Sequence, residues 1–332
     1  MQQTPPASRP QLDREGRLAH LLTLDGLPRA VLERLLDRAQ AFCDAQRGAV
    51  GDAAPHPRVD TLAGRTVATL FFEPSTRTRA SFELAATRLG ADVLTLDVKS
   101  SSTAKGETVL DTFLTFAALG VDAVVVRHAE AGIHATLAAH AGEVAVLNAG
   151  EAHVSHPTQG LLDALTIRQH KGPDLARLSV AIVGDVVHSR VASSAISALR
   201  TLGVGELRLV GPRELLPDDA GRRADLVLHD FDAGIAGCDV VMMLRVQKER
   251  MGDGPRTGPA DDAAYHRAWG LTAARLARAK PDCIVMHPGP VNRGVELADE
   301  VMDGPRSVIL QQVANGVAVR MAVLESLLGA SR

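Results

Sequence analysis

The chain has 332 residues, of which 46% are hydrophobic, and its formal net charge at pH 7 is −3. Because this length exceeds the usual size of one hydrophobic core, we expect two domains. The small negative charge gives no general attraction for nucleic acid or for an anionic membrane, and no long uncharged apolar run could span a bilayer. The composition therefore predicts a soluble globular protein without nucleic-acid or membrane partners.

The three cysteines, Cys43, Cys238 and Cys283, are far apart and match no metal-binding or redox spacing. They are typical of buried free thiols in a reducing compartment, so we expect a cytoplasmic protein. Residues 1–10 lack the basic start and apolar core of a secretory signal, and we expect a disordered tail over 1–12. No cofactor or metal ion is predicted.

The first predicted element is an amphipathic helix over residues 27–42, starting near Pro28, and a loop over 48–60 follows it. From Thr66 onward, short apolar runs alternate with helical patterns, which predicts parallel sheets with helices on both faces. Ligands bind beyond the carboxyl ends of the strands in such sheets. The polar residues directly after each apolar run are therefore the candidates for a functional site.

Eight apolar runs are expected to be strands, and the chain ends in an apolar helical pattern over 310–328. The expected strands are 66–72, 93–98, 121–126, 144–147, 179–183, 206–210, 239–244 and 283–286. A Gly-, Pro- and Asp-rich stretch at 251–264 is expected to be a loop that closes over a substrate.

Ser75-Thr76-Arg77-Thr78-Arg79 follows the first strand, and Ser75 is the expected N-cap of the next helix. Arg77 and Arg79 fall in the first turn, where the helix dipole disfavours each cation by roughly 0.3–1 kcal/mol. Two arginines, hydroxyl groups and free backbone N–H groups at one helix start predict an anion site, most simply for phosphate. A solvated helix start that carries arginine is the alternative.

Other candidates in the first half allow two interpretations each. Lys105 lies among small hydroxyl residues in the stretch 99–107, which is either a solvated flexible loop or a loop that carries a cation to a site. Arg127 directly follows a buried strand and is either a surface cap or a site residue. His153 and His156 suggest a metal site only weakly, because neither Cys nor a carboxylate completes a familiar ligand set.

The second half contains a strand followed by Gly184-Asp185, where a dinucleotide site would be sought. The Gly-x-Gly-x-x-Gly turn is missing and Asp185 occupies the place that a pyrophosphate needs, which disfavours a nicotinamide dehydrogenase. Arg190 beyond this strand is either a carboxylate ligand or an exposed helix-start residue. The charged run at 245–250 is either a solvated face or an anion-binding segment.

The last expected strand ends in His287-Pro288-Gly289-Pro290. Two prolines around a glycine impose an unusual turn, in which an X–Pro bond can be cis.

No nucleophile-elbow sequence is present, so the sequence does not indicate a Ser-His-Asp catalytic triad.

Taken together, five segments resemble the motifs of the carbamoyltransferases over residues 22–328. They are 75–79, Ser-x-x-x-Lys-Gly-Glu at 101–107, His156-Pro157-Thr158-Gln159, Arg245-Val246-Gln247 and 287–290. The segment at 245–247 resembles the aspartate carbamoyltransferases rather than the ornithine enzymes, whose segment must receive an ammonium group.

The resemblance implies an α/β fold with two doubly wound parallel-sheet domains joined by linking helices. The carbamoyl-phosphate domain would comprise 13–157 and 311–332, and the aspartate domain 158–310. The last helix would return to the first domain.

The resemblance also implies carbamoyl transfer from carbamoyl phosphate to the α-amine of L-aspartate, a step of pyrimidine biosynthesis. The implied carbamoyl-phosphate ligands are Ser75, Thr76, Arg77, Thr78, Ser101, Arg127, His156, Gln159, Gly289 and Pro290. The implied aspartate ligands are Lys105, Arg190, Arg245 and Gln247. The implied catalytic groups are Thr78, Arg127, His156 and Lys105.

Ser101 and Lys105 would act in the neighbouring subunit, so the resemblance implies a homotrimer with shared active sites. The trimer could act alone, with a regulatory chain, or with dihydroorotase or an inactive relative of it, and the N-terminal tail favours the last arrangement.

Rival hypotheses for the function are an ornithine carbamoyltransferase, a non-catalytic scaffold and a phosphate-binding module. Every family position that can be matched is filled, which argues against a scaffold.

Overall fold

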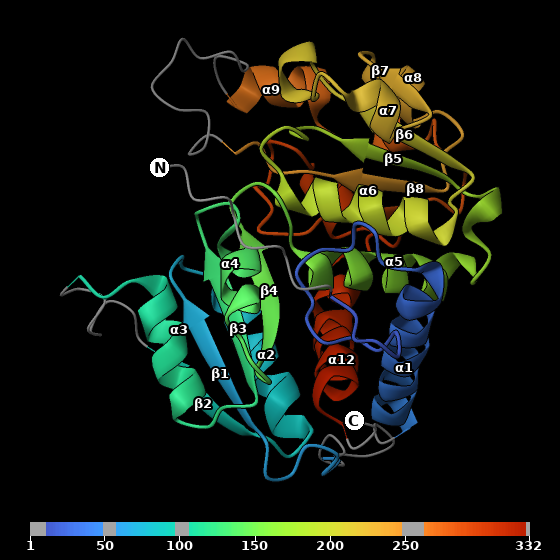
Figure 1. Ribbon diagram of the computed structural model, residues 1–332. Coiled ribbons are helices and arrows are strands. Elements are labelled where there is room, and N and C mark those ends of the chain that lie inside the picture. The colour runs from blue at the N-terminus through green and yellow to red at the C-terminus, as the bar shows by residue number, and fades with distance from the viewer. Residues whose placement is uncertain (1–10, 49–57, 97–105, 248–261, 330–332) are drawn as a thin grey trace. The chain divides into compact units, whose positions relative to one another are not determined.

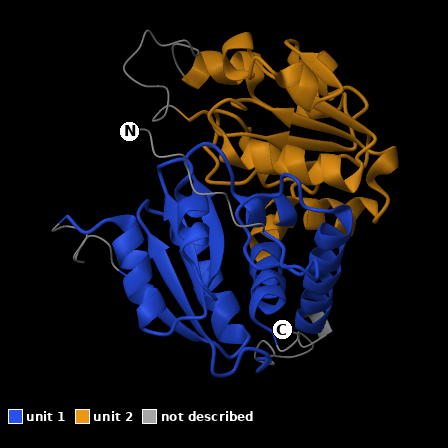
Figure 2. Ribbon diagram, viewed as in Figure 1, with its two compact units in different colours: residues 1–161, 315–332 blue, residues 162–314 orange. Residues whose placement is uncertain are grey.

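The structure is a computed structural model that describes residues 11–48, 58–96, 106–247 and 262–329 (Figure 1). The chain forms two compact units, coloured separately in Figure 2. Unit 1 comprises residues 1–161 and 315–332, and unit 2 comprises residues 162–314. The domain boundaries expected from the sequence each differ from these limits by about four residues and stay predictions.

Unit 1 contains a four-stranded, fully parallel sheet with the order β2-β1-β3-β4. Its strands are β1 (Thr66–Phe71), β2 (Asp92–Leu96), β3 (Ala123–His128) and β4 (Ala145–Glu151). Val67 pairs with Ala123, and Val124 pairs with Val146, so the inner strands are held on both sides. Every residue of β4 is buried, whereas the edge strand β2 is largely exposed.

The helices of unit 1 follow the strands in alternation. They are α1 (Arg29–Gly48), α2 (Thr76–Arg88), α3 (Val109–Ala118) and α4 (Ile133–Ala139), with the start of α5 (Pro157–Lys171) and most of α12 (Ile309–Leu328). The final helix contacts the first, because Arg38 donates to Glu325 at 2.8 Å and the Cys43 thiol donates to the Asn315 side chain at 3.6 Å. Both α5 and α12 cross the limits of the two units.

Unit 2 contains a five-stranded, fully parallel sheet with the order β7-β6-β5-β8-β9. Its strands are β5 (Ser179–Val183), β6 (Glu206–Val210), β7 (Leu226–Leu228), β8 (Val240–Met243) and β9 (Ile284–Met286). Its α-helices include α6 (Arg190–Leu202), α7 (Ala220–Arg223), α8 (Phe231–Ile235), α9 (Asp262–Trp269), α10 (Ala273–Leu276) and α11 (Asp299–Met302). Short 3₁₀ turns lie at Leu175–Arg177 and Arg213–Leu215.

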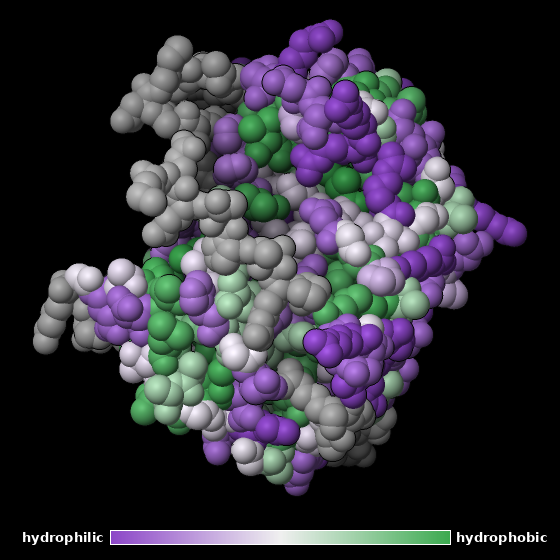
Figure 3. Space-filling model, in the orientation of Figure 1, coloured by the Kyte–Doolittle hydropathy of each residue, from purple (hydrophilic) through white to green (hydrophobic). Residues whose placement is uncertain are grey.

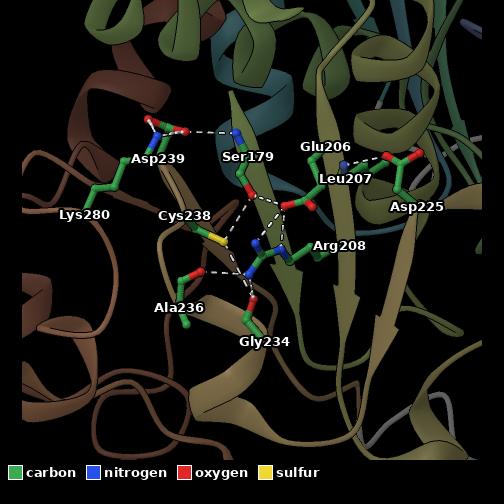
Figure 4. A network of polar contacts seen from close by, with 10 residues as sticks. All are labelled: Ser179, Glu206, Leu207, Arg208, Asp225, Gly234, Ala236, Cys238, Asp239 and Lys280. Atoms are coloured by element: carbon green, nitrogen blue, oxygen red, sulfur yellow. Dashed lines mark hydrogen bonds and ion pairs between the residues drawn. The ribbon is translucent and has the colours of Figure 1, made fainter. Parts of the chain in front are cut away.

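Carboxylates fix the amino ends of the unit 2 strands. Asp239, directly before β8, accepts the backbone N–H of Ser179 at 2.9 Å, and both of its oxygens accept from Lys280 at 2.8 Å (Figure 4). Asp225, before β7, accepts the backbone N–H of Leu207 at 2.8 Å. Each acidic side chain satisfies a donor at the start of a neighbouring strand and thereby favours the observed register.

Glu206, the first residue of β6, is the centre of a second polar group at the amino ends of the unit 2 strands (Figure 4). It accepts the Ser179 hydroxyl at 2.6 Å and the Arg208 guanidinium at 2.8 Å. These two hydrogen bonds outweigh burial and hold the pKa of Glu206 below its usual range. Arg208 also donates to the carbonyls of Gly234 and Ala236 at the end of α8, so the strand and the helix end are joined.

The eight predicted strands are all present, with end positions that differ by up to four residues. The expected first helix is longer than predicted and ends at Gly48. The stretch expected to be a loop at 251–264 lies mostly outside the described residues. Its last three residues, Asp262 to Ala264, form the start of α9, so the prediction of a loop is wrong for these residues. The sequence reasoning also missed β7 and α4, because three to seven residues are too few to establish a period.

Two further expectations can be compared with the fold. Gln11, expected in the disordered tail, accepts the backbone N–H groups of Leu22 and Thr23 through its side chain and so belongs to unit 1. All three cysteines are buried and free, as predicted. No helix in the described ranges combines the length and the apolarity that a membrane span needs.

Candidate functional site

The carboxyl ends of β1, β3 and β4 lie next to one another in unit 1, because these strands are neighbours in a parallel sheet. Phe71, at the end of β1, pairs with Arg127 on β3. The segments that follow these three strands carry most of the side chains expected to bind carbamoyl phosphate. The topology of unit 1 therefore gathers segments that are far apart in the sequence at one edge of the sheet.

The start of α2 contains the segment that was expected to bind an anion. Ser75 is the N-cap residue, as predicted, with extended backbone angles (φ −161°, ψ 91°), but its side chain makes no capping hydrogen bond to the helix. No acidic residue occupies the first turn. Thr76 and Arg77 are exposed, whereas Thr78 is buried. A helix start with no acidic residue in its first turn favours an external anion.

Arg127 is not a surface cap, because its side chain is only 13% exposed. It donates from Nη1 to the carbonyl of Ala149 at 3.2 Å, and its Nε lies 3.5 Å from an oxygen of Glu73. The Ala149 carbonyl is available because β4 contains one residue more than β3 between the pairs Val126–Asn148 and His128–Glu151. This β-bulge orients the guanidinium at the sheet edge.

His156 and Gln159 lie at the amino end of α5, and both are buried. Pro157 is the first residue of this helix, a position that needs no backbone donor. His153 is exposed, so the two histidines do not share one environment. Within the described residues, no group of three or more His, Cys, Asp or Glu side chains could hold a metal ion.

In unit 2, the carboxyl ends of β5, β8 and β9 are neighbours in the same way. Arg190, the first residue of α6, is only 5% exposed, so the alternative of an exposed helix-start residue is wrong. The hydroxyl of Ser189 caps this helix by accepting the backbone N–H of Ala192 at 3.1 Å. A buried arginine at this edge can pair with a carboxylate ligand.

Arg245 and Gln247 lie together just beyond β8. Arg245 donates from Nη2 to the Gln247 side-chain oxygen at 3.1 Å. The backbone N–H of Gln247 donates to Asp185 at 3.0 Å, which fixes the segment to the end of β5. The rest of the charged run, from Lys248 to Arg250, lies outside the described residues, as do Ser101 and Lys105.

Asp185 organises this edge, a role that its sequence context did not reveal. It is fully buried, and it accepts from both the backbone N–H and the Nδ1 of His188 as well as from Gln247. Gly184 before it has φ +115°, and a Cβ there would lie 3.1 Å from both the Leu244 carbonyl and the Tyr265 hydroxyl. Only glycine fits this turn without strain. Because the Asp185 carboxylate occupies the position just after β5, it leaves no place for a pyrophosphate.

The turn after β9 contains a cis bond between Gly289 and Pro290, in agreement with the expectation. His287 is buried and holds the turn, because its Nδ1 accepts the backbone N–H of Gly289 at 2.8 Å. Its own backbone N–H donates to the side chain of Gln312 at 2.9 Å. Glu296, whose side chain is fully buried, lies 3.4 Å from Nε2 of His287. No local sequence pattern indicated this last contact.

The chain matches two family models, which together span most of its length. Residues 19–169 match "Aspartate/ornithine carbamoyltransferase, carbamoyl-P binding domain", and residues 176–327 match "Aspartate/ornithine carbamoyltransferase, Asp/Orn binding domain". Over 320 residues the chain is 59% identical to the aspartate carbamoyltransferase catalytic subunit of Stenotrophomonas maltophilia strain K279a. That alignment covers 96% of this chain and 99% of the relative.

Solved structures of two related enzymes are similar to this one. An aspartate transcarbamoylase from Trypanosoma cruzi in complex with carbamoyl aspartate and phosphate matches with a TM-score of 0.79 and 31% identity, covering 93% of this chain and 96% of that chain. An ornithine carbamoyltransferase from Pyrococcus furiosus matches with a TM-score of 0.80 and 29% identity, covering 94% and 98%. Because enzymes with either acceptor match equally well, the fold alone does not distinguish the acceptor.

Proposed function

Because the chain belongs to the aspartate/ornithine carbamoyltransferase family, we propose that it transfers the carbamoyl group of carbamoyl phosphate to the α-amine of L-aspartate. The products are N-carbamoyl-L-aspartate and phosphate, and the reaction serves pyrimidine biosynthesis. The observation that carries this proposal is the 59% identity, over 96% of the chain, to a protein named as an aspartate carbamoyltransferase catalytic subunit. The segment from Arg245 to Gln247 at the end of β8 supports aspartate as the acceptor.

Residues of unit 1 bind carbamoyl phosphate in this proposal. The phosphate lies at the start of α2, where Ser75, Thr76 and Arg77 supply hydroxyl groups, backbone N–H groups and one guanidinium. Negative charge at this position is favoured by the helix dipole and by charge-assisted hydrogen bonds. Ser101 and Lys105 of a neighbouring subunit complete the phosphate site.

The carbamoyl group contacts a second set of residues. Thr78, Arg127 and His156 donate hydrogen bonds to its carbonyl oxygen, which polarises the carbonyl and stabilises the oxyanion that forms during attack. Gln159 and the carbonyl groups of the Gly289–Pro290 turn accept from the carbamoyl NH₂. Arg127 is suited to this role because the Ala149 carbonyl and Glu73 already orient its guanidinium.

Aspartate binds to residues of unit 2 and to Lys105. Arg190 and Arg245 pair with its two carboxylates, and Gln247 orients Arg245 through the 3.1 Å hydrogen bond. An ornithine side chain would bring an ammonium group toward arginine and would be repelled. The charge of this segment therefore favours aspartate.

The transfer is a direct substitution through a tetrahedral intermediate. The aspartate amine forms the new C–N bond to the carbamoyl carbon, the C–O bond to phosphate breaks, and phosphate leaves with the electron pair. The amine loses a proton, which phosphate accepts. Proximity of the two substrates and stabilisation of the oxyanion supply most of the acceleration, because no side-chain nucleophile takes part.

We place this enzyme in the cytoplasm as a homotrimer with shared active sites, with a dihydroorotase-like or regulatory chain as a candidate partner. Figure 3 shows hydrophobic residues over α3 and the edge strand β2, where Leu94, Leu114 and Leu119 are 40%, 42% and 69% exposed. An exposed apolar patch next to an open strand edge supports association through this part of unit 1.

The three buried free thiols support the proposed location in a reducing compartment.

The first test is carbamoyl transfer by the chain purified alone, with L-aspartate or L-ornithine as the acceptor. We expect turnover with aspartate only. Arg77→Ala should abolish turnover without changing the circular dichroism spectrum, whereas Arg34→Ala, which alters an exposed arginine on α1, should match the parent. A substantially active Arg77→Ala variant would contradict the phosphate assignment, and turnover with ornithine would contradict the acceptor.

The shared site is tested with hybrid oligomers. Chains with Lys105→Ala and chains with Arg77→Ala should both be inactive, but mixtures should regain activity, because some sites then combine an intact Arg77 with an intact Lys105 from the neighbour. If activity does not return after subunit exchange has been verified by mass, the sites are not shared.

A further inference from the structure

His134 and Glu151 form a buried pair in unit 1 that has no role in the chemistry described so far. His134 belongs to α4 and is fully buried, and Glu151 is the last residue of β4 and is 8% exposed. Nδ1 of His134 lies 3.3 Å from one carboxylate oxygen of Glu151. Nε2 lies 2.9 Å from the carbonyl oxygen of Val126 on β3.

These two contacts constrain where the imidazole carries its protons. A carbonyl oxygen can only accept, so Nε2 must carry a proton. A neutral ring would leave the lone pair of Nδ1 3.3 Å from a carboxylate oxygen, an unfavourable contact that a doubly protonated ring avoids. Burial raises the pKa of Glu151, but the contact with His134 and the N–H of Gly132 outweigh it and hold that pKa below its usual range. The geometry therefore favours an imidazolium beside a carboxylate.

A second histidine lies close to this pair. His128 on β3 is a further titratable group close to both members of the pair. Burial lowers the pKa of His128, and its Nδ1 accepts the backbone N–H of Glu130 at 3.0 Å, so it adds no second cation.

Glu151 connects this ion pair to the turn before α5. Its other oxygen accepts the backbone N–H of Gly132 at 2.5 Å, and its backbone N–H donates to the carbonyl of Ser155 at 2.9 Å. Ala152 within this turn has φ +43°, an uncommon conformation for a residue other than glycine. The next residue after Ser155 is His156, so the ion pair holds the turn that leads into it.

The same carboxylate lies at the end of the bulge that supports Arg127. The side chain of Asn148 donates to Glu151 at 3.3 Å and accepts the backbone N–H of Gly150 at 2.7 Å. Between these residues, the carbonyl of Ala149 accepts from Arg127 at 3.2 Å. Movement of the Glu151 carboxylate would therefore move the acceptor that orients the guanidinium.

We propose that His134 and Glu151 are positioning residues, whose buried ion pair fixes the end of β4 so that Arg127 and His156 are held in place for the carbamoyl group. The role as positioning residues rests on the proposed function, but the ion pair itself does not. The pair touches no substrate and acts only through Arg127 and the turn that precedes His156.

The kinetic test is a double-mutant cycle with Glu151→Gln and His134→Gln. Each single variant should lower kcat by about ten- to hundredfold and raise KM for aspartate much less, because the loss concerns oxyanion stabilisation. The double variant should be no worse than the more impaired single variant, since the two residues act as a unit. Single variants with unchanged kcat, or with fully additive losses, would overturn the positioning role.

Matched controls come from the same two elements. His140→Gln alters the exposed C-cap residue of α4, and Glu143→Gln alters an exposed carboxylate just before β4. Both should match the parent in kcat and in KM. If the controls are as impaired as the test variants, the effect is a general loss of stability and the proposal fails.

The ion pair has a readout that does not depend on activity. In nitrogen-15 spectra of histidine-labelled parent chain at pH 7, the His134 ring should show two protonated nitrogens, and Glu151→Gln should remove the imidazolium signature. A His134 ring with a single protonated nitrogen in the parent would overturn the ion pair. A parent without carbamoyl transfer would refute the proposed function and the positioning role together, whereas an active parent with unimpaired variants would refute the positioning role alone.

Discussion

Asp185→Asn tests how much of the unit 2 edge depends on one buried carboxylate. The substitution preserves the shape of the side chain but replaces one acceptor oxygen with an NH₂ donor. One oxygen of Asp185 accepts from the backbone N–H of Gln247 at 3.0 Å, and the other accepts from the backbone N–H and Nδ1 of His188 at 3.2 and 2.8 Å. Whichever way the amide is oriented, one backbone N–H faces a donor.

The magnitude follows from that lost acceptor. A buried donor left without a partner costs about 1–3 kcal/mol, because its desolvation is no longer compensated. At about 2–4 °C per kcal/mol for a domain of 150–250 residues, a loss near 2 kcal/mol lowers the melting temperature by about 4–8 °C. Displacement of Gln247 also disturbs Arg245, so we expect KM for aspartate to rise about tenfold, which corresponds to about 1.4 kcal/mol.

The assay compares Asp185→Asn with Asp225→Asn by thermal unfolding and steady-state kinetics. Asp225 also accepts a backbone N–H, from Leu207 at 2.8 Å, but its side chain is 41% exposed and its ion pair with Arg200 lies at the amino edge of the sheet. Water can solvate the displaced groups there, so its variant should lose less than about 1 kcal/mol and keep its KM. Equal melting temperatures and equal KM values for the two variants would refute the reasoning.

Two further predictions concern ionisation. Hydrogen bonds from Ser179 and Arg208 hold the pKa of Glu206 below its usual range, so its stabilising effect is present above the unfolded-state pKa and is lost as the pH falls through the folded-state pKa. In urea unfolding, the parent should exceed Glu206→Gln in stability at pH 7, and the difference should shrink below about pH 4; a constant difference would contradict this. Burial raises the pKa of Cys283 to about 12, and Cys43 and Cys238 are also buried, so Ellman's reagent should label no thiol of the native chain and all three after denaturation. Rapid labelling of the native protein would show that at least one thiol is accessible.

Local patterns were sufficient for the alternation of strands and helices and for the positions of the main motifs. The run before Ser75 and the run before Arg190 are each short, apolar and bounded by polar turns, and such patterns depend on neighbouring residues only. The chemistry of the motif at 75–79 could also be inferred from neighbouring residues, because two arginines in one helical turn indicate an anion site without any knowledge of the fold. Segments as short as β7 carry too little pattern to be identified in this way.

The burial of Arg127 and of Arg190 was decided by the tertiary structure, since each could equally have been an exposed residue at the end of its element. The bulge in β4, the contacts of Asp185 and the pairing of His134 with Glu151 also join residues from different elements. Sequence periodicity reports which face of an element is buried, but it does not report which strand becomes its neighbour. Sequence patterns alone were therefore enough for the longer elements and for the chemistry of the motifs. The strand order in each sheet established which polar groups meet, because those contacts depend on pairing between distant parts of the chain.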